Sequence, residues 1–249
     1  MVNKQGLASY CQECGACAAC TDAAYVPGMD SQLVDTIVNQ ILQSVQPGFS
    51  EETSRSPYPL IPLGVSNRHA HLTRKTLEIL FGSGTDLENM RALYQPSDFA
   101  AKQTITIVGS KMRAIQNVRI LGPLRKYDQV ELSLTDAIQI GVKPPVRNSG
   151  DLHDAAPLTL VGPKGSVHIE KCAIIASRHL HMTNQDAAVF GIVDGDLCKV
   201  RIGGEKATTF ENVLVRTNDA WRLQLHLDTD DANAANVRCN TQVEFVGKM

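Results

Sequence analysis

The hydrophobic pattern divides the chain into a helical N-terminal segment and a strand-rich remainder. Between residues 30 and 46 apolar side chains recur every four positions, at Leu33, Ile37, Ile41 and Val45. This spacing places an apolar stripe along one side of a helix. Asp30 or Ser31 can cap its start, and the Pro47-Gly48 pair ends it. Residues 47–57 are polar and proline-rich, which is typical of a linker.

From residue 60 the pattern changes to short runs of alternating apolar and polar positions. Runs such as "TITIVG", "QVELSL" and "LQLHL" are rich in β-formers, and glycine or proline punctuates their spacing. Short strands at such close intervals favour barrels or sandwiches. Helical stretches follow some of them, in "TRKTLEILFG", "TDAIQIG", "TNQDAAVFG" and "DDANAANV". The pattern therefore predicts a mainly β protein, with barrels capped by short α-helices.

One motif, R-H-x-H-x-T, occurs twice, in "SNRHAHLT" and in "SRHLHMT". Residues i and i+2 of a strand point to the same face, so each H-x-H presents two imidazoles side by side. A third segment, "ELSLTDAIQIG", shares the threonine and the glycine that follows it. If the three threonines are aligned, one position is occupied by His69, Glu131 and His179.

These residues suggest a metal site. His226 lies on the polar face of another alternating run, where a fifth imidazole can join the set. An isolated H-x-H strand is more often a surface pairing, but the repetition favours ligation. Five imidazoles and one carboxylate are enough for two divalent ions, and zinc is the commonest choice for such ligands. The predicted metal ligands are His69, His71, Glu131, His179, His181 and His226.

Composition narrows the function classes. The 249 residues carry a net charge of −2, so no basic field favours nucleic acid as a partner. No run approaches the roughly 18 apolar residues of a membrane span, and the N-terminus lacks the apolar region of a secretory signal. Seven cysteines, an odd number, then favour reduced thiols in the cytoplasm. We expect Cys172, Cys198 and Cys239 to be small core residues, because their surroundings are apolar.

The first 29 residues form a cysteine-rich leader. Cys11, Cys14, Cys17 and Cys20 recur every third residue. Four thiolates so close together can hold a zinc ion or an iron–sulfur cluster. The spacing lacks the longer last gap and the following proline of ferredoxin runs, so a flexible, reduced leader or a redox-active tail is the alternative.

Several long motifs carry a family resemblance, among them "NVRILGPLRKYDQVELSLTDA", "PPVRNSGDL" and "LHLDTDDANAA". Residues from about 58 to about 240 resemble the phosphate propanoyltransferase family, the PduL-type phosphotransacylases of bacterial microcompartments. The resemblance implies two β-barrels capped by short helices, one of which combines the first strand with the C-terminal half. The expected domains are barrel 1, from residues 58–67 plus 177–249, and barrel 2, from residues 68–176.

The resemblance also implies a reaction, in which an acyl-CoA and inorganic phosphate give an acyl phosphate and coenzyme A. It implies two zinc ions per chain. One would be held by His69, His71 and Glu131, and the other by His179, His181 and His226. Arg125, in "GPLRK", would be catalytic and would bind phosphate together with Ser149, in "VRNSGD".

Some features leave alternatives open. Asp98 replaces an amide and Gln103 a carboxylate of the family pattern, which bears on substrate preference.

The helix at 30–46 either caps a barrel or docks on microcompartment shell proteins or core enzymes, which would place the protein in the microcompartment lumen. Two other functions remain, a dinuclear zinc hydrolase and a non-catalytic, metal-stabilised binding module. The acyl chain, the direction of reaction and the formation of a homo-oligomer stay undetermined.

Overall fold

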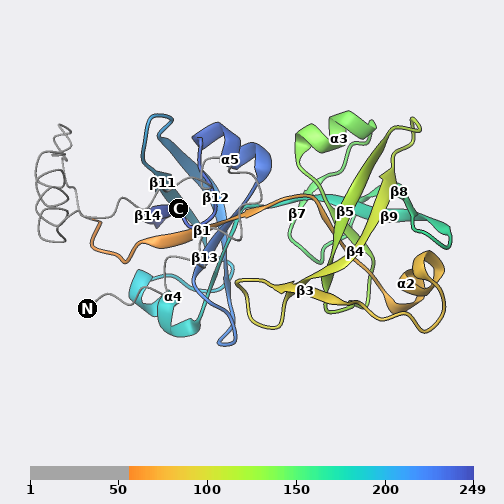
Figure 1. Ribbon diagram of the computed structural model, residues 1–249. Helices are drawn as coiled ribbons and strands as arrows, with labels where there is room; N and C mark the ends of the chain where they lie inside the picture. The colour runs from red at the N-terminus through yellow and green to blue at the C-terminus, as the bar shows by residue number, and fades with distance from the viewer. Residues whose placement is uncertain (1–55) are drawn as a thin grey trace, which may run out of the picture. The chain divides into compact units, whose positions relative to one another are not determined.

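The computed structural model describes residues 56–249. The leader at 1–29, the helix at 30–46 and nearly all of the linker at 47–57 lie outside the described residues, so the predictions made for them stay predictions. Figure 1 shows the described part as two groups of strands with short helices at their ends. No helix within residues 56–249 is long and apolar enough to cross a membrane.

The first group of strands closes into a six-stranded barrel. Its strands follow one another around the barrel as β1 (Ile61–Ser66), β13 (Gln224–Asp228), β10 (His179–Met182), β12 (Thr208–Thr217), β11 (Leu197–Ile202) and β14 (Gln242–Lys248). Pairing of β14 with β1 completes the ring. The barrel interior is apolar because alternate side chains point inward, and Leu63, Leu225 and Val200 are fully buried there.

The second group also closes into a six-stranded ring. Its order is β4 (Phe99–Val108), β5 (Ala114–Gly122), β2 (His69–His71), β6 (Gln129–Glu131), β9 (Ser166–Ala176) and β8 (Ala156–Val161). The pairing of β8 with β4 closes it. Two short strands extend the sheet, β3 (Asn89–Ala92) beside β4 and β7 (Val146–Arg147) beside β9. The expected fold class, mainly β with two helix-capped barrels, is confirmed for the described residues.

Four short helices begin directly after strands that carry predicted ligands. They are α2 (Arg74–Phe81), α3 (Leu134–Ile140), α4 (Asn184–Phe190) and α5 (Thr229–Ala235). Their N-caps are Thr73, Ser133, Thr183 and Asp228, each of which accepts a hydrogen bond from the backbone N–H three residues on. Because a cap side chain satisfies a helix N–H that would otherwise lack a partner, these residues determine where each strand gives way to its helix.

Two glycines let the helices pack closely on the second barrel. A Cβ at Gly109, in the β4–β5 turn, would lie 2.2 Å from the carbonyl oxygen of Ile140 at the end of α3. A Cβ at Gly162, in the β8–β9 turn, would lie 2.4 Å from the carbonyl oxygen of Leu80 in α2. The two hairpins therefore receive the two helices in the same way, and only glycine fits at these contacts.

The buried-cysteine prediction holds for two of the three residues. Cys172 and Cys198 are fully buried in strands, and burial raises the pKa of each thiol to about 12. Cys239 is exposed, so the expectation was wrong there. It lies in the connection between α5 and β14, where its Sγ accepts a hydrogen bond from the backbone N–H of Val65 in β1 at 3.3 Å.

Candidate metal and phosphate site

The predicted ligands lie on two antiparallel strand pairs built to one plan. In the second barrel β2 pairs with β6, which sets His69 opposite Glu131 and His71 opposite Gln129. In the first barrel β10 pairs with β13, which sets His179 opposite His226 and His181 opposite Gln224. Each barrel thus places an H-x-H strand beside a strand that carries glutamine and one further predicted ligand.

The helix caps correct the expected equivalence between the repeats. The N-cap of α3 is Ser133, which forms a capping box with Asp136, and Thr135 lies inside the helix. Glu131 therefore stands two residues before its cap, as His71 stands before Thr73, and the alignment of Glu131 with His69 was wrong. The position four residues before the cap holds His69, Gln129, His179 and Gln224.

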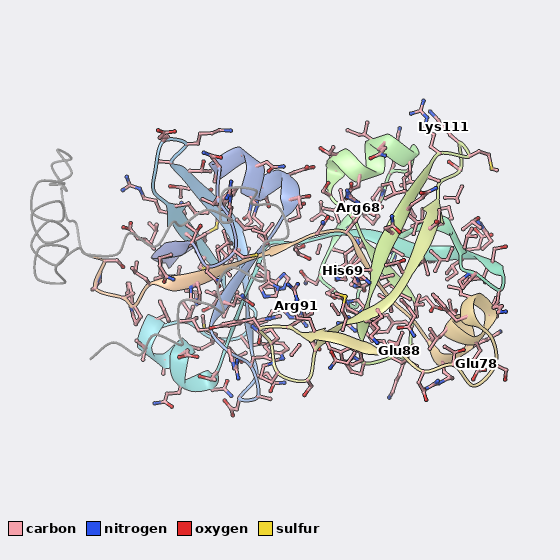
Figure 2. All side chains as sticks on the ribbon, viewed as in Figure 1. Arg68, His69, Glu78, Glu88, Arg91 and Lys111 are labelled. Carbon is pink, nitrogen blue, oxygen red and sulfur yellow. The ribbon has the colours of Figure 1, made fainter. Side chains whose placement is uncertain are left out.

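The chain enters each H-x-H strand as it passes from one barrel to the other. Figure 2 shows Arg68 and His69 where the chain leaves β1 and enters the second barrel. The backbone carbonyl of Asn67 accepts a hydrogen bond from Nδ1 of His69 at 2.8 Å, and that of Ser177 accepts one from Nδ1 of His179 at 2.8 Å. A carbonyl can only accept, so both rings carry their proton on Nδ1, and Nε2 is left free to bind an ion.

The arginines of the repeated motif form ion pairs that hold the two segments in which the chain passes between the barrels. A nitrogen of Arg68 lies 3.4 Å from a carboxylate oxygen of Asp136, and Arg178 makes a two-pronged contact with Asp231 at 2.8 and 2.9 Å. Both aspartates occupy the third position of a helix, α3 or α5. The hydrogen bonds that Arg178 donates to Asp231 raise the pKa of Arg178. The arginines therefore tie each crossing segment to the helix that follows the partner strand.

The first cluster consists of His69, His71 and Glu131, which are all buried. Their candidate ligand atoms all lie within 4.8 Å of one another, and Nε2 of His69 is 3.5 Å from Glu131. Burial, followed by the nearby His69 and Arg125, holds the pKa of His71 well below its ordinary value, so this ring is neutral. Burial works against the charged form of Glu131, but His69 leads the charges and hydrogen bonds that bring its pKa below the usual value.

The second cluster consists of His179, His181 and His226, with ring centroids 4.7 to 4.9 Å apart. Burial, followed by His179 and Arg216, lowers the pKa of His181 to about 3. Burial also lowers the pKa of His179 and holds that of His226 well below the ordinary value. Three neutral imidazoles packed together are ready to donate electron pairs to a cation.

Unpartnered atoms support ion binding at both clusters. Nδ1 of His71 and both ring nitrogens of His181 are buried without a hydrogen-bond partner among the described residues. Buried polar atoms are nearly always paired, because an unpaired one carries the full cost of leaving water. The ligand types, two imidazoles with a carboxylate and three imidazoles, suit a divalent ion such as zinc. The residues present therefore fit the metal that the sequence suggests.

The two predicted phosphate-binding residues lie beside the first cluster. Nη1 of Arg125 donates to the hydroxyl oxygens of Tyr127 at 3.3 Å and of Ser149 at 3.4 Å. The backbone N–H of Arg125 donates to the carbonyl of Leu72 at 2.9 Å, which ties its loop to the segment after His71. The structure thus brings Arg125 and Ser149 together at one edge of the buried carboxylate–histidine cluster.

Of the two departures from the family pattern, only Asp98 faces this region. Burial raises the pKa of Asp98, while the nearby Arg125 and His69 act on it in the opposite direction. Gln103 instead donates to the carbonyl of Asp86 at 2.9 Å and accepts from the N–H of Glu88 at 3.0 Å. Glu88 lies apart from His69 in Figure 2. Because Gln103 contacts Glu88 and Asp86, which are both exposed, it stabilises a surface turn and not the cluster.

Sequence reasoning missed four polar residues around the clusters. Gln129, Gln224 and Gln95 are buried, and Asp128 accepts hydrogen bonds from the N–H of Thr73 and the hydroxyl of Thr76 at 2.7 and 2.8 Å. In α3 and α4 the carboxylate at the helix start comes from the first turn of the helix itself, from Asp136 and Asp186. At the start of α2 Asp128 supplies this carboxylate instead. The Q-x-E and Q-x-H patterns of the two strands were the available signal, but glutamine alone indicates no particular chemistry.

Known proteins of one family resemble this chain over most of its length. The family model described as "Phosphate propanoyltransferase" matches residues 62–238. A phosphate propanoyltransferase of Lachnoclostridium phytofermentans is 44% identical over 218 residues, which cover 88% of this chain and 100% of the relative. That of Thermotoga maritima is 49% identical over 189 residues, covering 76% and 90%, and that of Rhodopseudomonas palustris is 39% identical over 226 residues, covering 88% and 99%. The chain therefore belongs to the phosphate propanoyltransferase family and is a phosphate acyltransferase.

Proposed function

We propose that this enzyme interconverts a short-chain acyl-CoA, propanoyl or acetyl, and inorganic phosphate with acyl phosphate and coenzyme A. The observation that carries the proposal is the contact of Arg125 and Ser149 at the edge of the His69, His71 and Glu131 cluster. A positively charged fork and a hydroxyl beside a candidate metal site are suited to hold a phosphate next to a reacting carbonyl.

The chemistry follows from these groups. An oxygen of phosphate attacks the thioester carbonyl carbon, the carbon–sulfur bond breaks, and coenzyme A leaves with the bonding electron pair. Arg125 would hold the phosphate oxygens through charge-assisted hydrogen bonds and aim the attacking oxygen. Ser149 adds a neutral donor on the same side. Two zinc ions, when bound by the six predicted ligands, would polarise the carbonyl and stabilise the departing thiolate.

The two buried cysteines have no place in this scheme as nucleophiles. Cys172 and Cys198 are buried in the barrel walls, and their raised pKa keeps both as thiols. We therefore propose direct transfer to phosphate, without a covalent acyl-enzyme on either of these thiols.

The deciding experiment measures release of coenzyme A from acetyl-CoA and propanoyl-CoA, with and without inorganic phosphate. We expect release to depend on phosphate and acyl phosphate to form in equal amount. Release that is independent of phosphate would indicate a zinc hydrolase that uses water. An absence of turnover in metal-loaded protein would favour a binding module.

Two further parts of the proposal rest on the family and on the sequence. We propose that residues 30–46 dock on microcompartment shell proteins or core enzymes, which would place the enzyme in the lumen. We also propose domain boundaries at 58–67 plus 177–249 and at 68–176, which the strand pairing supports. Deletion of residues 1–46 tests the first part, since co-localisation with shells should be lost while phosphate-dependent turnover remains.

A further inference from the structure

One buried amide, that of Gln129, joins the metal cluster to the phosphate-binding residues. Its side chain is fully buried at the start of β6. Nε2 of Gln129 lies 2.7 Å from a carboxylate oxygen of Glu131 and 2.9 Å from the hydroxyl of Ser149. Its Oε1 lies 2.8 Å from the backbone nitrogen of Gly150. Every polar atom of this amide is therefore engaged.

The chemistry of the partners determines which way the amide faces. A backbone N–H can only donate, so the atom facing Gly150 must be the amide oxygen. The nitrogen then faces Glu131 and Ser149, and because an amide nitrogen can only donate, the serine oxygen accepts. The flip that often makes glutamine orientation ambiguous is excluded here.

This orientation directs the Ser149 hydroxyl as well. The serine oxygen accepts one hydrogen bond from Gln129 at 2.9 Å and another from Nη1 of Arg125 at 3.4 Å. A hydroxyl oxygen has two lone pairs, so both are used and the O–H proton remains to be donated. Gln129 and Arg125 both contact the serine as donors, so neither of them accepts this proton. A phosphate beside Arg125 would be an anionic acceptor for it.

The other barrel contains a matched residue without this link. Gln224 occupies the equivalent strand position, and its Oε1 lies 2.7 Å from Nε2 of His226 and 3.4 Å from Nε2 of Gln95. Both buried glutamines therefore contact the candidate ligand two residues on. Only Gln129 also contacts a serine that an arginine contacts.

We propose that Gln129 is a positioning residue for phosphate, which holds Ser149 so that its hydroxyl donates to the anion bound by Arg125. The same amide ties this donor to Glu131, so the phosphate and the first metal cluster keep one geometry. The proposal rests on the proposed function, since phosphate is the anion that it names.

The test is a double-mutant cycle on the metal-loaded, full-length protein. Gln129→Met removes the donor, Ser149→Ala removes the hydroxyl, and the double variant combines them. We expect each single variant to raise the KM for phosphate about tenfold, as expected for one hydrogen bond to a charged group, with the KM for acyl-CoA within about twofold. Because Gln129 acts through Ser149, the double variant should be no worse than Ser149→Ala. Multiplying effects, or an unchanged phosphate KM in Gln129→Met, would overturn the proposal.

Two controls separate positioning from folding. Gln116→Met, at an exposed position of β5, makes the same substitution without a site contact and should leave all constants unchanged. Gln129→Glu keeps the oxygen that accepts from Gly150, so it serves if Gln129→Met does not fold, and it should also raise the phosphate KM. A Gln129→Glu variant that binds and uses phosphate like the parent would equally refute the inference.

Calorimetric titration of inorganic phosphate into each metal-loaded variant distinguishes this proposal from the proposed function. If the parent releases no coenzyme A in the presence of phosphate, the proposed function fails, and the calorimetry still decides the role of Gln129. Phosphate binding that weakens about tenfold in Gln129→Met supports positioning, and equal binding in parent and variant contradicts it.

Discussion

Replacing Arg125 with lysine tests the phosphate-binding part of the site most directly. The substitution keeps the positive charge but replaces a planar fork with a point charge, so a two-pronged grip on phosphate is lost. The backbone N–H of Arg125, which donates to Leu72 at 2.9 Å, does not depend on the side chain. The loop should therefore keep its place, and only the terminal contacts with Tyr127 and Ser149 change.

The size of the effect follows from the contact that is lost. One charge-assisted hydrogen bond contributes about 1.5 to 3 kcal/mol, and each 1.4 kcal/mol corresponds to a factor of ten. We therefore expect kcat/KM for phosphate to fall about 10- to 100-fold in Arg125→Lys. The assay varies phosphate at saturating acyl-CoA and measures release of coenzyme A, with metal content and the thermal midpoint determined in parallel.

A matched control and a clear counter-result complete this prediction. Arg113→Lys, at an exposed position of the β4–β5 turn, should leave every constant unchanged. If Arg125→Lys shows unchanged kinetics with phosphate as the varied substrate, Arg125 does not bind phosphate. If metal is lost together with activity, Arg125 acts on the cluster instead.

Three further predictions follow from the clusters and their supports. His69→Ala and His179→Ala should each lower the metal content by about one ion per chain in elemental analysis and abolish turnover, whereas full activity after exhaustive chelation would contradict the metal hypothesis. Asp128→Ala should reduce the free energy of unfolding by about 1 to 3 kcal/mol, because the N–H of Thr73 and the hydroxyl of Thr76 lose their acceptor. A urea unfolding midpoint equal to that of the parent would refute this. Metal-free protein should lose stability as the pH falls below about 6.5, because the pKa of His181 is about 3 in the folded chain and the unfolded chain binds the proton first. At pH 5 this one group corresponds to about 2 kcal/mol, and an unchanged thermal midpoint between pH 7 and pH 5 would argue against it.

The local elements and the family could be predicted from the sequence. Alternating polarity predicted the strands, and the four helical stretches appear as α2 to α5. Strands and helices depend on residues only a few positions apart in the chain, so the pattern of apolar and polar residues is enough to predict them. The long motifs around Arg125 and the two H-x-H strands were specific enough to indicate the family, which the comparisons confirm.

The cap of α3 shows where local reasoning ends. The alignment of the repeats used threonine as the common position, but Ser133 is the residue that forms the capping box, and Thr135 lies two residues further on, inside the helix. The N–H of Thr135 donates instead to Asp230, a residue of α5. Serine and threonine both cap well, so the choice depends on where the strand ends, which its pairing with other strands decides.

Only the tertiary structure decided how distant side chains combine. Residues of β1 pair with those of β13 and β14, and Gln95 reaches the backbone of Arg222 at 2.9 and 3.0 Å. Gln129 belongs to the site because it contacts Ser149 and Gly150, which lie in a loop distant from β6 in the sequence. A glutamine has no periodic signal of its own, because its role depends on which donors and acceptors the closed barrel brings to it. The sequence by itself therefore determined the elements and the residue types of the candidate metal clusters, whereas closure of the barrels decided which of them share a hydrogen-bond network.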